Sequence, residues 1–419
     1  MSDRTVDLIA AFIFGLALAH TFAARQFERL SRRLPRHAGL LHLLGEVEVV
    51  FGVWAIVLVL AMAFAAGADT ALAYAESRDY TEPLFVFVVM VVAASRPILQ
   101  VVHTTVGRLA RVVPLPAPLA SVWLGLAAVP LLGSLITEPA AMTIAALMLL
   151  PQVFAPALPE RLKYLALGVL FVNVSIGGTL TSYAAPPVLM VASTWQWDTA
   201  FMLHNFGWKA LAAVVINASI ATFLLREHLQ STARSIDRGG ALRVPVLVFV
   251  VHLALLAGVV LLAHHPVAFL GLFLLFLGFA QAYERHQDPL ILREALLVAF
   301  FLAGLVVLGG LQRWWLQPIV STLEPLALFF GALGLTAITD NAALTYLGSL
   351  VTGMSDESKY MLVAGSIAGG GLTVIANAPN PAGMALLRKG FADESVGAAG
   401  LLLGALAPTL VAAAAFLLL

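Results

Sequence analysis

Two polar interruptions recur in this apolar sequence, each occurring once in either half of the chain. Residues 137–143 (TEPAAMT) align with residues 339–345 (TDNAALT), with identity at four of seven positions. Residues 177–187 (GGTLTSYAAPP) align with residues 370–380 (GGLTVIANAPN) in the same order. Because glycine and proline interrupt helices, each half is predicted to contain a turn followed by a broken helix.

The composition limits the class of protein. Hydrophobic residues make up 61% of the 419 residues and charged residues only 11%, whereas soluble domains average about 25% charged residues. The chain has no cysteine and no net charge, which excludes disulfides and thiolate metal sites and leaves no basic surface typical of nucleic-acid binding. We therefore predict an all-α polytopic membrane protein.

The apolar segments and the flanking charges predict a topology. A bilayer-spanning helix needs roughly 20 apolar residues, and loops rich in arginine and lysine stay in the cytoplasm. Loop 25–37 carries five arginines, so the N-terminus and, after an even number of crossings, the C-terminus are predicted outside. About ten transmembrane helices are expected, at residues 5–24, 45–66, 83–106, 162–192, 207–225, 244–263, 266–283, 290–308, 359–388 and 396–418.

Two further apolar segments, residues 118–156 and 321–354, do not fit as single crossings. Arg111 and Arg161 flank the first segment and both belong on the cytoplasmic side. Each segment is therefore expected to enter the membrane and return, which makes it a re-entrant hairpin.

The hairpins are predicted to turn near Glu138 and near Asp340. Five full crossings separate the two turns, so the repeats are expected to be inverted relative to one another. We expect one membrane domain over residues 1–419, with the first repeat at about 45–226 and the second at about 244–419. Two of the helices are expected to be broken at the membrane midplane.

Asp340 is expected to be the main ion-binding carboxylate and Glu138 the second. A carboxylate at bilayer depth costs about 2.5–3.5 kcal/mol on insertion scales, and such a group can hold a proton or a cation but poorly both. Broken helices expose carbonyl oxygens, which are hard ligands suited to hard cations. Further hydroxyl and amide ligands are predicted at the turns and breaks, although capping is the common alternative for each: Thr137, Thr179, Thr181, Ser182, Thr339, Asn341, Asn377 and Asn380.

Arg96 is the possible charge partner of a membrane carboxylate. It is expected either to pair with Glu138 or Glu46, or to extend toward the cytoplasmic interface. Three isolated histidines in predicted spans, His20, His103 and His252, favour interhelical hydrogen bonding over a proton relay.

These motifs resemble the ion-transporter superfamily and, within it, the bacterial sodium/proton antiporters. The resemblance rests on Ile338–Ala342 (ITDNA), on residues 177–187 and on Asn377–Asn380 (NAPN), and it covers roughly residues 118–392. It implies a homodimer with a scaffold and a moving transport domain. It also implies cation sites that combine Glu138 with residues 177–187, and Asp340 with residues 370–380.

Two transport functions remain open from the sequence. The first is exchange of sodium or lithium for protons across a bacterial inner membrane, with sodium as substrate or coupling ion and no other cofactor. The alternative is sodium-coupled symport of a small organic or inorganic anion, received by half-helix N-termini. Sodium-coupled dicarboxylate carriers in the superfamily typically show Ser-Asn-Thr where this chain has Thr-Glu-Pro and Thr-Asp-Asn, which favours a cation as cargo. An enzyme is not expected, because no activated nucleophile and no His-Glu zinc motif is present.

Overall fold

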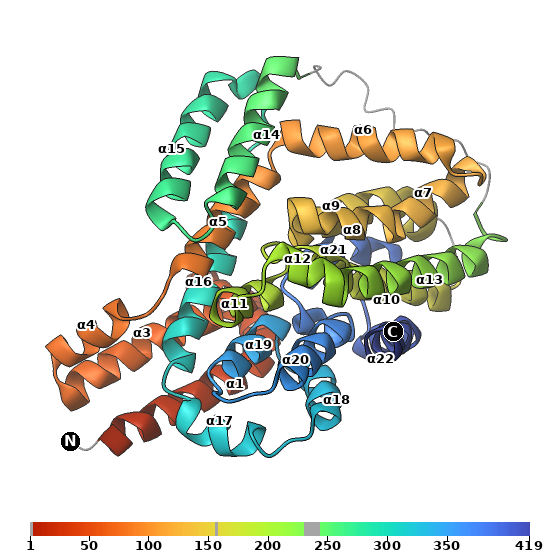
Figure 1. Cartoon of the computed structure of the whole chain (residues 1–419). Helices are drawn as coiled ribbons and strands as arrows, with labels where there is room; N and C mark the ends of the chain where they lie inside the picture. Colours follow the sequence, from red (N-terminus) through yellow and green to blue (C-terminus); the bar gives the residue numbers. More distant parts are fainter. Residues whose placement is uncertain (1–2, 156–157, 230–243) are drawn as a thin grey trace.

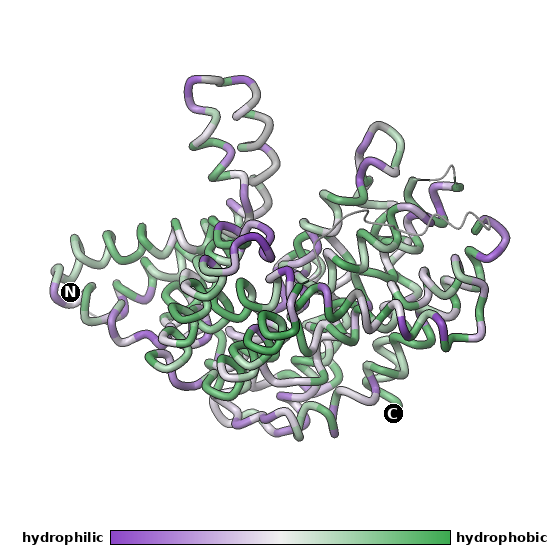
Figure 2. Tube along the Cα trace, turned by 90° about the horizontal axis from the view of Figure 1, so that it is seen from above, coloured by the Kyte–Doolittle hydropathy of each residue, from purple (hydrophilic) through white to green (hydrophobic). Residues whose placement is uncertain are grey.

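The computed structural model describes residues 3–155, 158–229 and 244–419, and within these ranges it contains helices and no strand (Figure 1). The all-α prediction is confirmed. Hydrophobic residues run along most helices, while polar residues concentrate at the turns between them (Figure 2). Six of the described helices are long and apolar enough to cross a membrane, or up to eight if two bent pairs each count as one span. The expected ten spans therefore remain a prediction.

Helices from the first part of the chain form a wall together with one later helix. The wall consists of α1, α3, α5 and the later helix α16, in which α16 packs against both α3 and α5, and α1 packs along α3. The helices of this part are α1 (Asp3–Arg33), α2 (Ala38–Gly45), α3 (Val47–Ala66), α4 (Ala68–Glu76), α5 (Thr81–Ala93) and α6 (Arg96–Val112).

The next part contains the first hairpin, which we define as α8 and α9, and the first break, residues 178–185. α9 packs against both α8 and α7, so the chain folds back on itself at Thr137. The helices are α7 (Ala117–Leu126), α8 (Ala128–Ile136), α9 (Glu138–Leu149), α10 (Glu160–Gly177), α11 (Pro186–Trp195), α12 (Thr199–Met202) and α13 (Trp208–Leu225).

The last part contains the second hairpin, α18 and α19, and the second break, residues 370–379. The helices are α14 (Val246–Leu261), α15 (Pro266–Ala282), α16 (Leu292–Gly309), α17 (Arg313–Val320), α18 (Pro325–Thr336), α19 (Asn341–Ser349), α20 (Asp356–Gly369), α21 (Asn380–Leu387) and α22 (Ala398–Leu418).

The helix that follows each break packs against the hairpin of the other half. α11, which follows the first break, packs against α19 of the second hairpin, and α21, which follows the second break, packs against α9 of the first hairpin. The polar motifs of both halves therefore meet in one region of the molecule.

Two predicted segments are more bent than expected. Residues 83–106 do not form one helix, because α5 and α6 meet at a 70° bend. Pro97 has no N–H to extend the helical ladder, and Ser95 is extended with ψ 144°. The segment expected to be the first hairpin, which ends at residue 156 just outside the described residues, also bends by 41° between α7 and α8.

The α3–α16 crossing depends on glycine. A β-carbon on Gly304 would overlap the backbone of Phe51 and Gly52 on α3. Gly304→Ala is therefore expected to force the wall apart and to destabilise the protein by about 1–3 kcal/mol. Thermal unfolding of purified protein in detergent measures this effect as a lower melting temperature.

The matched control is Gly278→Ala on α15, where an added β-carbon meets no atom within 4 Å. Equal melting temperatures for both variants would contradict the close packing of α3 on α16.

Candidate functional site

The tip of the first hairpin places a carboxylate inside the protein. α8 ends at Ile136, and Thr137 turns the chain with φ 85° and ψ 150°, a region that residues with a β-carbon rarely adopt. α9 then begins at Glu138, whose side chain is fully buried. At this first helical position the carboxylate faces the positive end of the helix dipole.

Glu138 lies between the breaks of both halves. Its Oε2 accepts a hydrogen bond from Nδ2 of Asn377 in the second break, at 2.8 Å. Gly178 in the first break leaves room for the carboxylate, because a β-carbon there would lie 2.6 Å from Oε1 of Glu138. The structure thus brings Glu138 together with both predicted breaks.

The tip of the second hairpin is built differently. Asp340 caps α19: its Oδ1 accepts hydrogen bonds from the backbone N–H of Ala342 at 2.8 Å and of Ala343 at 3.2 Å. The neighbouring Asn341 is buried, and its Nδ2 lies 3.5 Å from Oγ of Ser175 on α10. Ser175 in turn donates to the carbonyl of Ile367 on α20. The second tip therefore also contacts the broken helices of both halves.

Four buried carboxylate and amide oxygens around the tips and breaks receive no hydrogen bond from any described residue. Buried polar atoms in proteins are nearly always hydrogen-bonded, because an unpaired one loses its solvation without compensation. Carboxylate and amide oxygens are the ligands that hard cations prefer. The four are Glu138 Oε1, Asn341 Oδ1, Asn377 Oδ1 and Asn380 Oδ1.

Threonines tie each break to the hairpin of its own half. Thr181 Oγ1 in the first break donates to the carbonyl of Ser134 at 2.7 Å. In the second break, Thr373 Oγ1 donates to the carbonyl of Ala337 at 2.8 Å. These bonds pair carbonyls that the helix ends leave without an intrahelical partner.

Sequence analysis missed Ser134. Its Oγ donates to the carbonyl of Gly177 at 2.7 Å and accepts the N–H of Leu180 at 2.9 Å, so it joins α8 to the end of α10 and to the first break. A signal for it exists, because Ser134 and Thr336 stand at the same 202-residue offset as Glu138 and Asp340.

Several other predicted ligands have local roles. Thr179 Oγ1 and Thr339 Oγ1 each donate to a carbonyl near the end of the helix that precedes them. The Oγ of Ser182 lies 3.3 Å from Thr199 Oγ1. Asn380 Nδ2 spans the second break by donating to the carbonyls of Gly370 and Thr373. For Thr179 and Thr339 the hydrogen bonds match the capping and turn-forming alternative.

The ion pairs that the structure gives for Arg96 and Glu46 involve other residues, and the pairing of Arg96 with Glu138 or Glu46 stays a prediction. Arg96 Nη1 lies 3.8 Å from Asp288, and Glu46 pairs with Arg293 at 2.6 Å. Arg96 is the first residue of α6, directly after the bend. His20 forms the expected interhelical contacts: its Nδ1 accepts the indole N–H of Trp54 and its Nε2 bonds the carbonyl of Leu44.

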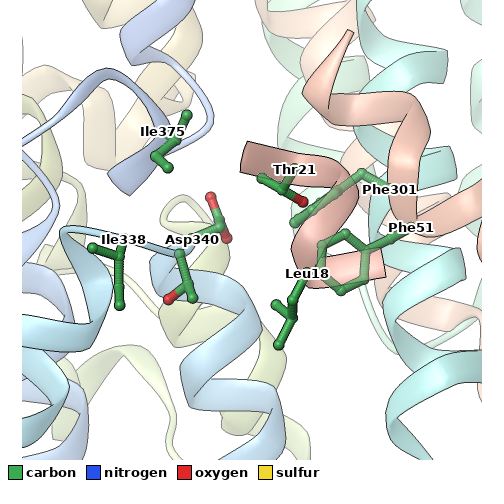
Figure 3. A pocket seen from close by; sticks show the side chains of 8 residues that line it. Leu18, Thr21, Phe51, Phe301, Ile338, Asp340 and Ile375 are labelled. Carbon is green, nitrogen blue, oxygen red and sulfur yellow. The ribbon is translucent and has the colours of Figure 1, made fainter. Parts of the chain in front are cut away.

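A small cavity, which we call the Asp340 cavity, separates the second tip from the wall (Figure 3). Thr339, Asp340 and Ile375 line one side, and residues of α1, α3 and α16 line the other. The wall residues are Leu18, Thr21, Phe51 and Phe301.

A second small cavity lies beside the first tip, and we call it the Thr137 cavity. Thr137 and Pro139 line it together with residues of both breaks, Tyr183 and Ala378. Its wall side is apolar and consists of Val86, Val89, Met90 and Val298. Each hairpin tip therefore faces the wall across a small cavity.

Comparison with known proteins identifies the family. No curated protein matches the chain with significant similarity. A family profile described as "Putative Na+/H+ antiporter" matches residues 5–419, nearly the whole chain. The chain therefore belongs to this Na+/H+ antiporter family.

Proposed function

We propose that the protein exchanges sodium or lithium for protons by alternating access, with Glu138 as the principal carboxylate. The observation that carries this proposal is that Oε1 of the fully buried Glu138 has no hydrogen-bond partner among the described residues. Asn377, whose Nδ2 donates to the other carboxylate oxygen, likewise has an amide oxygen without a partner in the described part of the chain. A bound cation would be coordinated by these oxygens and would balance the negative charge of the carboxylate. A proton on Oε1 would instead neutralise the carboxylate, so the two ions compete for one group.

Asp340 is proposed as the second carboxylate. It is half-buried and lines the Asp340 cavity, and its Oδ1 already receives two backbone N–H bonds. These bonds stabilise the charged carboxylate, which suits a group that attracts cations. The sequence ranked Asp340 above Glu138; complete burial and the unpaired oxygen favour the reverse order.

The repeat architecture stays part of the proposal. We propose inverted repeats with two re-entrant hairpins, in a homodimer in a bacterial inner membrane with both termini outside. The exchanged packing of α11 on α19 and of α21 on α9 supports this symmetry. The cavities between the tips and the wall support a moving part that contains the hairpins and a stationary part that contains the wall.

Glu138→Gln keeps the size of the side chain and an oxygen acceptor for Asn377 but removes the charge. In proteoliposomes with an imposed sodium gradient, we expect this variant to lose proton movement at least about tenfold, because losing a buried interaction with a charged group costs 1.5–3 kcal/mol. A pH-sensitive dye inside the vesicles measures the exchange. Asp340→Asn is expected to reduce exchange as well.

Glu284→Gln, at an exposed position, is the control and should exchange like the parent. Normal exchange by Glu138→Gln would overturn the assignment. Sodium-dependent uptake of a labelled anion without proton movement would favour the symport alternative.

Gly178→Ala tests the space around the carboxylate. The added β-carbon would lie 2.6 Å from Oε1 of Glu138, so we expect the oxygen to shift and the sodium concentration for half-maximal exchange to rise about tenfold, which corresponds to 1.4 kcal/mol. The sodium dependence of exchange measures this shift.

Gly334→Ala on α18, where a β-carbon meets no atom within 4 Å, is the matched control. If both variants show the sodium dependence of the parent, Gly178 does not shape the site.

A further inference from the structure

A polar contact joins α5 of the wall to α11 behind the first break. Ser193 Oγ donates to Glu82 Oε1 at 2.6 Å, and both side chains are half-buried. Bonds this short between a hydroxyl and a carboxylate are charge-assisted and stronger than neutral ones. Glu82 lies in the first turn of α5, and Ser193 lies near the C-terminal end of α11.

The contact lies one helical turn beyond the Thr137 cavity. Side chains four residues apart share a face of a helix. Val86 follows Glu82 by four residues on α5, and Leu189 precedes Ser193 by four residues on α11. Val86 and Leu189 both line the Thr137 cavity, so the hydrogen bond closes the gap between the two helices at one end of it.

The polarity of the residues changes sharply from Glu82 along the Thr137 cavity. Glu82 carries the charge, while the α5 residues that follow it into the cavity are apolar: Val86, Val89 and Met90. Polar groups return at Thr137, the residue before Glu138. A cation that enters from this end therefore meets the Glu82 carboxylate first and an apolar stretch next.

We propose that Glu82 and Ser193 form a gate at this end of the Thr137 cavity, with Glu82 as the first carboxylate that an entering cation meets. The gate opens when Ser193 releases Glu82, which separates α5 from α11 over Val86 and Leu189. The identity of the passing ion rests on the function proposed above, whereas the opening itself is measured without transport.

The test uses the absence of native cysteine. Val86→Cys places a single thiol just behind the gate, and its reaction with a charged methanethiosulfonate reagent is followed on the purified full-length protein in detergent. Adding Ser193→Ala removes the hydrogen bond, and the labelling rate is expected to rise about tenfold because a hydrogen bond to a charged group is lost. Ser193→Thr keeps the hydroxyl and is expected to retain the slow rate.

Thr21→Cys, which lines the Asp340 cavity on the other tip, is the control and should label at the same rate with and without Ser193→Ala. An unchanged rate at Val86→Cys would overturn the gate, and so would an equal acceleration at Thr21→Cys, which indicates general loosening. Both results are independent of whether the protein exchanges sodium for protons.

The role of the Glu82 charge is tested by comparing the labelling rates of reagents of opposite charge. In the Ser193→Ala, Val86→Cys protein, a cationic reagent is expected to react faster than an anionic one of similar size. Glu82→Gln should abolish this preference. If the ratio of the two rates does not change, Glu82 is not the first group that an entering cation meets.

Discussion

The hydrogen bond between Glu138 and Asn377 is the interaction on which the site depends. It joins the tip of the first hairpin to the break of the other half, at 2.8 Å and inside the protein. A buried carboxylate without partners would be strongly unfavourable. The amide N–H and the start of α9 stabilise one side of the carboxylate, while Oε1 remains without a donor among the described residues. The carboxylate therefore still has one oxygen with which it can bind an ion.

Much of the surrounding structure holds that arrangement in place. Gly178 allows the first break to lie close to Oε1. The turn at Thr137 makes Glu138 the first residue of α9, so that its carboxylate lies at the start of this helix. Ser134 and Thr181 lock the first break to the first hairpin. The glycine contacts between α3 and α16 keep the wall compact. The hairpins and breaks therefore form one connected unit, which faces the wall across two small cavities.

The sequence predicted the helical class, the family and the regions that meet, because hydrophobicity and helix breakers are local properties of the chain. Glu138 and Asn377 were both singled out, but their direct contact was not, since the sequence paired each tip with the break of its own half. Only the tertiary packing of α9 on α21 creates that contact. The bend before Pro97 was not predicted, because hydrophobicity does not show whether a helix continues straight or changes direction. Ser134 was missed because a single serine in an apolar helix is an ordinary feature.

Proton release on sodium binding tests the central claim most directly. Sodium is added to the purified protein in weakly buffered detergent solution near the pH at which Glu138 is protonated, and the released protons are titrated. The account predicts about one proton released for each sodium bound at Glu138, because a cation and a proton compete for the same oxygens. Glu138→Gln should bind sodium weakly and release none. Sodium binding without proton release, or equal release by Glu138→Gln, would contradict the account.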